Sequence, residues 1–95
     1  MQNIKLVFDQ SCNYWEYDEG LSFAEMLVMQ QLHYIQDQYL ANGYIYEDRL
    51  YELFGAEWCP YNENRCIIRD RDGDLLHKYT IDSENQKIEI TWWIE

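Results

Sequence analysis

The side chains best suited to acid–base catalysis in this chain are its two histidines, His33 and His77. A catalytic histidine carries a proton when a second group orients its ring and a substrate group lies within hydrogen-bond reach. His33 has Asp37 one helical turn away, and His77 falls in a predicted strand close to Tyr79. Neither histidine has a nucleophile and an orienting partner at a suitable spacing. The sequence therefore indicates structural or surface histidines and no enzyme active site.

Three cysteines and one aspartate-rich segment are the candidates for metal binding. Cys59 and Cys66, with Cys12 or a histidine, could supply zinc ligands, but structural zinc sites use ligand pairs two to four residues apart and six residues separate this pair. The segment DRDGD at 70–74 has the alternating aspartates of a calcium loop, yet its Gly73 stands fourth where an EF-hand needs glycine sixth. We therefore expect no metal and no cofactor, and three free thiols that behave as small hydrophobes.

Carboxylates are the most abundant charged groups of the chain. Eighteen Asp and Glu residues stand against seven Lys and Arg residues, which gives a formal net charge of −11. A field of this sign repels nucleic acid and anionic membranes and draws the protein toward basic surfaces. We therefore expect no direct binding to nucleic acid or to a membrane, and a basic protein as the partner.

The segment NYWEYDEG, residues 13–20, places three aromatic rings among three carboxylates in a predicted loop. Tyr and Trp anchor protein interfaces, and surrounding charges steer the approach of a partner. In the alternative interpretation, Trp15 and Tyr17 cover the core beneath the loop, and the sequence favours neither. A second acidic segment surrounds Gly73, and the last strand carries an accessible tryptophan. The residues predicted to contact a partner are Tyr14, Trp15, Glu16, Tyr17, Asp18, Glu19, Asp70, Asp72, Asp74 and Trp93.

The spacing of apolar residues predicts the elements that hold these side chains. Alternation over 4–8 predicts a first strand, and apolar residues three and four positions apart predict a long helix over 23–41 and a short helix over 47–54. Gly43 suits the left-handed residue that ends the long helix, and the short helix stops at Gly55.

The C-terminal half of the chain has the pattern of strands. Residues 66–70 and 75–81 are predicted to pair as a hairpin through the Asp-Gly turn between them. The last strand alternates over 87–95, with its isoleucines and Trp92 on one face. The predicted fold is one α+β domain, residues 1–95, in the order β-α-α-β-β-β, with an antiparallel sheet packed on a long and a short helix.

Residues 32–55, LHYIQDQYLANGYIYEDRLYELFG, resemble a family of small uncharacterised proteins carried by bacteriophages and conjugative elements. In that family a helix with a Tyr-Ile pair ends at Gly-Tyr, a short helix closes on Leu-any-Gly or Leu-Gly, and a β-hairpin follows. Here Tyr34–Ile35, Gly43–Tyr44 and Leu53–Phe54–Gly55 take those places, read as core and caps. Trp58–Cys59–Pro60 stands where a glycine-containing loop is expected. The resemblance implies origin on a mobile element and brings no catalytic residues.

The expected compartment is the reducing cytoplasm of a bacterial host. The N-terminal segment has one lysine and a short apolar run, unlike a signal peptide, and no segment approaches the apolar length of a membrane span. An odd number of cysteines agrees with free thiols in such a compartment.

The composition is compatible with three classes of function. The first is an acidic inhibitor that occupies the basic nucleic-acid site of a bacterial defence protein, such as a CRISPR effector or a nuclease. The chain is similar to anti-CRISPR proteins in size and charge, and an immunity protein against a toxin nuclease would share the physics. The second is a self-associating phage protein, a possible homodimer in which the last strand extends a sheet or Met26, Leu27 and Met29 leave a helix face open. The third is a small enzyme or ligand binder. Charge favours the first.

Overall fold

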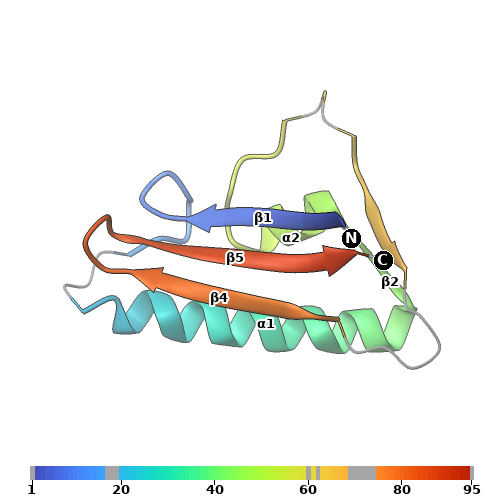
Figure 1. Ribbon diagram of the computed structural model, residues 1–95, viewed down its shortest axis with the longest axis horizontal. Helices are drawn as coiled ribbons and strands as arrows, with labels where there is room; N and C mark the ends of the chain where they lie inside the picture. Colours follow the sequence, from blue (N-terminus) through green and yellow to red (C-terminus); the bar gives the residue numbers. More distant parts are fainter. Residues whose placement is uncertain (1, 17–19, 60, 62, 69–74, 95) are drawn as a thin grey trace.

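The structure is a computed structural model that describes residues 2–16, 20–59, 61, 63–68 and 75–94. Every strand pair in these residues is antiparallel, and the predicted α+β class is confirmed. A short strand between the two helices is an addition that the sequence analysis did not predict. The elements, shown in Figure 1, are β1 (Gln2–Phe8), α1 (Ser22–Asn42), β2 (Tyr44–Tyr46), α2 (Glu47–Leu53), β3 (Cys66–Ile68), β4 (His77–Asp82) and β5 (Lys87–Ile94).

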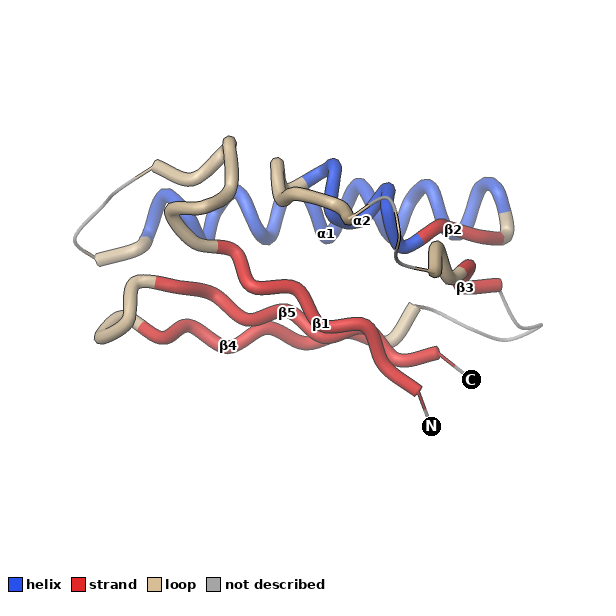
Figure 2. The backbone as a smooth tube through the Cα atoms, turned by 90° about the horizontal axis from the view of Figure 1, so that it is seen from above, coloured by secondary structure: helices blue, strands red, loops and turns tan. Residues whose placement is uncertain are grey.

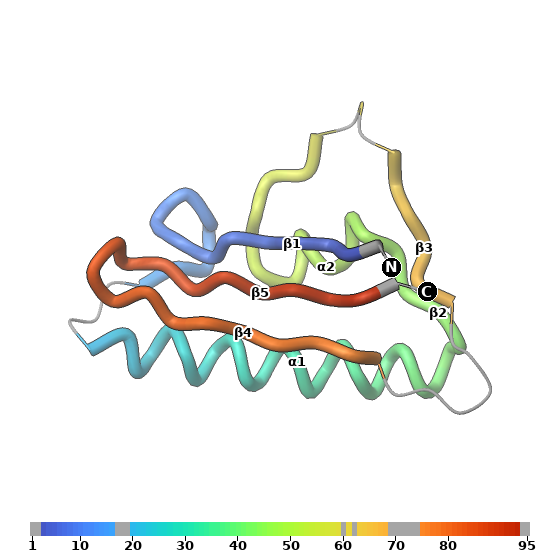
Figure 3. The backbone as a smooth tube through the Cα atoms, viewed as in Figure 1, coloured from blue at the N-terminus to red at the C-terminus, as the bar shows by residue number. Residues whose placement is uncertain are grey.

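The last strand is the centre of the main sheet. The strands lie in the order β1-β5-β4, and β2 and β3 form a separate two-stranded sheet. Phe8 lies opposite Ile88 and Asn3 opposite Trp93, so the first and last strands of the chain run side by side (Figure 3). Both helices lie on the same side of the three-stranded sheet (Figure 2). One face of that sheet is therefore covered, and we call the opposite face the outer sheet face.

The core forms where the alternating strands meet α1. On β5, Ile88, Ile90 and Trp92 have no exposed surface, which confirms the predicted alternation. Each such side chain stabilises the fold by about 1.5–3 kcal/mol relative to an exposed one. The remaining buried residues of β1 and α1 repeat every two and every three to four positions, namely Ile4, Leu6, Phe8, Ala24, Val28, Leu32, Ile35 and Tyr39.

The predicted hairpin between residues 66–70 and 75–81 is wrong. β3 pairs with β2, and β4 pairs with β5. The reason is that β2 takes up β3: the Glu47 N–H directly after β2 donates to the Arg65 carbonyl directly before β3 at 2.8 Å. β4 instead turns back onto β5, in a tight turn where Asp82 accepts hydrogen bonds from the backbone (3.1 Å) and side chain (2.8 Å) of Asn85. The Asp-Gly turn that suggested the hairpin lies outside the described residues.

The expectation that the last strand extends a sheet across two copies is also wrong. β5 has β1 on one side and β4 on the other, so both of its edges are occupied. A strand can recruit a further strand only through an edge with unpaired backbone groups.

Two glycines end the helices as predicted, and the second, Gly55, also contacts the loop after β1. Gly43 has φ 81° and donates its N–H to the carbonyl of Tyr39 at 2.9 Å. Gly55 has φ 68°, and a Cβ atom there would lie 2.9 Å from the backbone nitrogen of Tyr14 and 3.0 Å from that of Asn13. The Asn13 N–H donates to the Gly55 carbonyl at 2.8 Å. Gly55 therefore lets the loop after β1 pass directly against the end of α2.

Replacing these glycines by alanine should separate the two effects. Gly43→Ala introduces a left-handed alanine in open space and should lower the free energy of unfolding by about 1 kcal/mol. Gly55→Ala adds a backbone clash and should cost about 2 kcal/mol or more. Gly20→Ala, with nothing within 4 Å and no positive φ, is the control. Urea unfolding gives the order, and equal losses at Gly43 and Gly55 would contradict the close approach.

Candidate functional site

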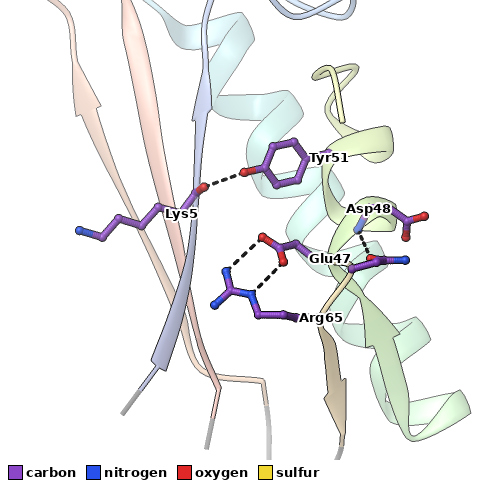
Figure 4. A network of polar contacts seen from close by, with 6 residues as sticks. Lys5, Glu47, Asp48, Tyr51 and Arg65 are labelled. Atoms are coloured by element: carbon purple, nitrogen blue, oxygen red, sulfur yellow. Dashed lines mark hydrogen bonds and ion pairs between the residues drawn. The ribbon is translucent and has the colours of Figure 1, made fainter. Parts of the chain in front are cut away.

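An ion pair with a buried carboxylate fixes the start of α2. Glu47, the first residue of α2, is 6 % exposed and accepts hydrogen bonds from Nε (2.9 Å) and Nη2 (3.1 Å) of Arg65 (Figure 4). The Glu47 N–H also donates to the Arg65 carbonyl at 2.8 Å. The hydrogen bond to Glu47 holds the pKa of Arg65 above its usual value. Two parallel charge-assisted bonds set both distance and orientation, so α2 and the segment before β3 are held as one unit.

Two further hydrogen bonds attach α2 to its surroundings, as Figure 4 shows. The Asp48 N–H donates to Oδ1 of Asn64 at 3.0 Å, which satisfies a free amide of the first helical turn. The Tyr51 hydroxyl donates to the Lys5 carbonyl of β1 at 3.1 Å. Burial raises the pKa of Tyr51, so this hydroxyl keeps its proton and remains a donor. α2 thus bridges the two sheets.

The strand directly before α2 presents two tyrosines to solvent. Within β2, Ile45 is buried, whereas Tyr44 is 48 % and Tyr46 45 % exposed. The two rings contact each other edge to face, with centroids 5.7 Å apart. Nearby, the Tyr34 hydroxyl of α1 accepts hydrogen bonds from Gln38 at 3.1 Å and from Arg49 at 3.4 Å. The contact between the rings of Tyr44 and Tyr46 restrains both side chains before any partner arrives, which lowers the entropy cost of binding.

An open groove of about 370 Å³ lies between the end of α1, β2 and α2. Its carboxylates, Asp48 and Glu52, belong to α2, and Glu52 forms an exposed ion pair with Arg49 at 3.1 Å. Tyrosine faces and carboxylates together favour a guanidinium or ammonium group. We call this site the tyrosine groove; it is lined by Gln38, Asn42, Tyr44, Ile45, Tyr46, Asp48, Arg49 and Glu52.

The charges of the chain are separated between two sides. All three lysines, Lys5, Lys78 and Lys87, lie on the outer sheet face, together with Asp82 and Glu89. The described strands therefore give this face a formal charge of +1, and the other described residues together carry −8. The negative field is thus strongest away from the outer sheet face.

The aromatic loop after β1 divides into a buried and an exposed part. Trp15 is half-buried and packs edge to face on Phe8, with centroids 5.1 Å apart, so it covers the core as the alternative interpretation expected. Tyr14, 52 % exposed, and Glu16, also exposed, face solvent at the far end of α2 from Tyr46. Of the remaining predicted residues, Tyr17, Asp18, Glu19, Asp70, Asp72 and Asp74 lie outside the described part of the chain.

Trp93 does not join the loop residues. It is half-buried on the outer sheet face opposite Asn3, whereas Trp15 packs on Phe8 at the other end of β1. Five residues of strand separate those ends by about 17 Å. Trp93 and the loop are therefore separate candidates, on different sides of the sheet.

Sequence reasoning missed the tyrosines of the groove. Tyr44 was interpreted as part of the core and caps of the 32–55 segment, and Tyr46 was not singled out. The alternation Tyr44–Ile45–Tyr46 is a strand signal of period two, and it places both tyrosines opposite the buried Ile45. Three residues are too few for that pattern to stand out beside the strong helix signals on either side.

The histidines and cysteines are dispersed. His33 is exposed on α1, and His77 is exposed at the start of β4, with Nδ1 3.2 Å from the Leu75 carbonyl. Cys12 is buried, Cys59 exposed and Cys66 half-buried, and all three are free thiols. Within the described ranges, no three His, Cys, Asp or Glu side chains gather in a way that could hold a metal ion.

Comparison with protein-family models, curated proteins and solved structures finds no match to this chain. Among the described helices, none has the length and apolar character needed to cross a bilayer.

The Glu47–Arg65 pair gives a direct stability prediction. Arg65→Met leaves a buried carboxylate without its cation, and because Arg65 is itself 34 % exposed we expect a loss of about 2–3 kcal/mol. Arg49→Met removes the cation beside Glu52, whose side chain is 69 % exposed, and should change stability by less than about 0.5 kcal/mol. Chemical unfolding compares the two. Equal losses would show that the buried pair does not fix α2.

Thiol reactivity tests the burial of Cys12. Desolvation raises the pKa of Cys12, so its thiolate is scarce in the folded protein and iodoacetamide should modify Cys59 first. A group whose folded pKa is raised contributes stability that is full below its unfolded pKa, about 8.5, and is lost as pH rises through the folded pKa. Cys12→Ala should therefore flatten the alkaline fall in stability. A fast-reacting Cys12 in Cys59→Ser protein would contradict this.

Proposed function

We propose that this chain works by binding a basic protein, as a small acidic inhibitor from a mobile element that acts in the bacterial cytoplasm. Its target would be a nucleic-acid-binding defence protein, such as a CRISPR effector or a nuclease. The tyrosine groove is the observation that carries this proposal, because it sets two half-exposed rings in mutual contact beside two carboxylates.

The groove suits an arginine or lysine side chain. Tyr44 and Tyr46 offer ring faces to a cation, and Asp48 and Glu52 offer charge-assisted hydrogen bonds to its N–H groups. Arg49 already forms an ion pair with Glu52, which shows that a guanidinium fits beside that carboxylate. A partner's arginine can compete for Glu52 or use Asp48. A residue of this kind would act as the anchor of the interface.

Long-range charge supports the same class of partner. Among the described residues, a formal charge of −8 outside the outer sheet face attracts a cationic groove before contact is made. Carboxylates on a rigid frame offer the negative potential and acceptor oxygens to which a nucleic-acid site responds. Tyr14 and Glu16, at the other end of α2, would extend the contact beyond the tyrosine groove. An immunity protein against a toxin nuclease would use the same physics.

Self-association is the second candidate, and exposed methionines favour it. Met26 is 59 % and Met29 49 % exposed on α1, whereas Leu27 packs against the core. Large apolar side chains on a surface commonly mark a contact site. This candidate does not exclude the first, since a dimer can also bind a basic partner.

Affinity capture from bacterial lysate tests the inhibitor proposal. The immobilised chain should retain a basic nucleic-acid-binding protein at low salt, identified by mass spectrometry, and release most of it at high salt. Tyr44→Ala/Tyr46→Ala should reduce the recovered partner about tenfold, because two anchor rings are lost. Tyr61→Ala, which removes a ring that is 94 % exposed outside the groove, is the matched control. If the amount of captured partner does not depend on salt, or if both variants recover equally little of it, the proposal is refuted.

A further inference from the structure

β4 is the strand of the main sheet with an open edge. In the order β1-β5-β4, both β1 and β4 are edge strands. Part of the β1 edge is occupied, because the Lys5 carbonyl accepts the Tyr51 hydroxyl and the Val7 carbonyl accepts the Cys12 thiol at 3.5 Å. By contrast, none of the six residues of β4 is buried. An exposed edge with free backbone groups is a template for another strand.

The pairing of β4 with β5 shows which backbone groups face that edge. The Trp93 N–H donates to the Leu76 carbonyl at 3.0 Å, so Leu76 belongs to a hydrogen-bonded pair. Hydrogen-bonded pairs recur at every second residue of an antiparallel ladder. Lys78, Thr80 and Asp82 therefore bond to β5. The N–H and C=O groups of the three residues between them, His77, Tyr79 and Ile81, point to the open edge.

We propose that two copies of this chain pair through β4, antiparallel and centred on Thr80, to form a continuous six-stranded sheet. In this register Tyr79 of one copy and Ile81 of the second copy exchange backbone hydrogen bonds. By the two-fold symmetry, Ile81 of the first copy and Tyr79 of the second copy do the same. A dimer with a two-fold axis uses one surface on both subunits, so that surface must complement itself.

The side chains of β4 meet this requirement in the register centred on Thr80. On the outer sheet face, Lys78 lies opposite Asp82 of the second copy, twice by symmetry, and Thr80 lies opposite Thr80 of the second copy. On the covered side, the ring of Tyr79 lies beside Ile81 of the second copy. Opposite charges, threonine pairs and aromatic–branched pairs are all favourable cross-strand neighbours.

Two of the neighbouring registers are less favourable. A shift centred on Lys78 places two lysines directly opposite each other, which is destabilising. A shift centred on Tyr79 leaves Lys78 opposite a threonine and Asp82 opposite Leu76 of the second copy.

Asp82 is well placed for the register centred on Thr80, because Asn85 fixes its carboxylate with two hydrogen bonds and leaves lone pairs free. Those bonds also hold the pKa of Asp82 below its usual value, so the group stays charged.

The dimer would leave the tyrosine groove available on each copy. The groove is built by the end of α1, β2 and α2, and it includes no residue of β4 or β5. Dimerisation therefore does not depend on the proposed inhibitor function, and either can fail alone. If both hold, two grooves in one particle would raise avidity for a partner that presents two basic sites.

Disulfide trapping tests the register. Thr80 and its symmetry mate form a non-hydrogen-bonded pair, with Cα atoms about 4.5 Å apart, inside the range that a disulfide spans. In Cys59→Ser protein, Thr80→Cys should form a covalent dimer when oxidised glutathione takes up the thiol protons and electrons. Val7→Cys is the matched control, because Val7 and Thr80 flank the same Glu89 from opposite sides. A trapped dimer with Thr80→Cys alone supports the proposal; equal or absent trapping overturns it.

Sedimentation velocity tests the interface without a new cysteine. The wild-type chain should shift from monomer to dimer as its concentration rises. Lys78→Glu should raise the dissociation constant at least about tenfold, because two attractive pairs become repulsive. Lys5→Glu makes the same charge change, also opposite Thr91, on the occupied edge, and should have little effect. Circular dichroism confirms that each variant folds. A monomeric wild type, or equal effects of the two lysine variants, overturns the proposal.

Discussion

The ion pair between the buried carboxylate of Glu47 and Arg65 is the constraint on which the proposed binding site depends. A carboxylate with 6 % exposure needs a cation, and the chain supplies one from 18 residues further on. The pair joins the first turn of α2 to the segment before β3, and β3 in turn holds β2. Because β2 leads directly into α2, the positions of Tyr44 and Tyr46 follow from this one contact.

The second constraint is the central place of β5. Ile88, Ile90 and Trp92 of this strand fill the core on one side, and the lysines of its neighbouring strands share its other face with Glu89. A strand in the middle of a sheet cannot recruit a further strand, so the proposed contact between copies uses β4. The same arrangement removes most negative charge from the outer sheet face. Acidic surface and open edge are therefore on different elements, and the two proposed interactions do not compete.

Periodic signals in the sequence predicted most of the fold. Alternation at Ile88, Ile90 and Trp92 and the helical spacing of α1 depend on local burial, which the sequence displays directly. The pairing of β3 with β2 was not predictable in this way, because it joins residues about twenty positions apart and a strong Asp-Gly signal indicated a different hairpin. For the site, the sequence predicted carboxylates and exposed rings as a binding surface, but it placed the carboxylates in the loop around Trp15 and in the segment around Gly73. The tyrosine groove combines Tyr46 of β2 with Glu52 of α2, and no periodic signal in the sequence shows that these two side chains line the same groove.

The central claim is that a cationic partner is recognised at the tyrosine groove and not by charge alone. An amide NMR titration of the labelled chain with a hexa-arginine peptide tests this most directly, at low and at physiological salt. We expect the largest shifts at Tyr44, Tyr46, Asp48 and Glu52, weakening with salt but keeping the same pattern. Shifts that spread evenly over all exposed carboxylates, or that centre on the outer sheet face, would contradict the account.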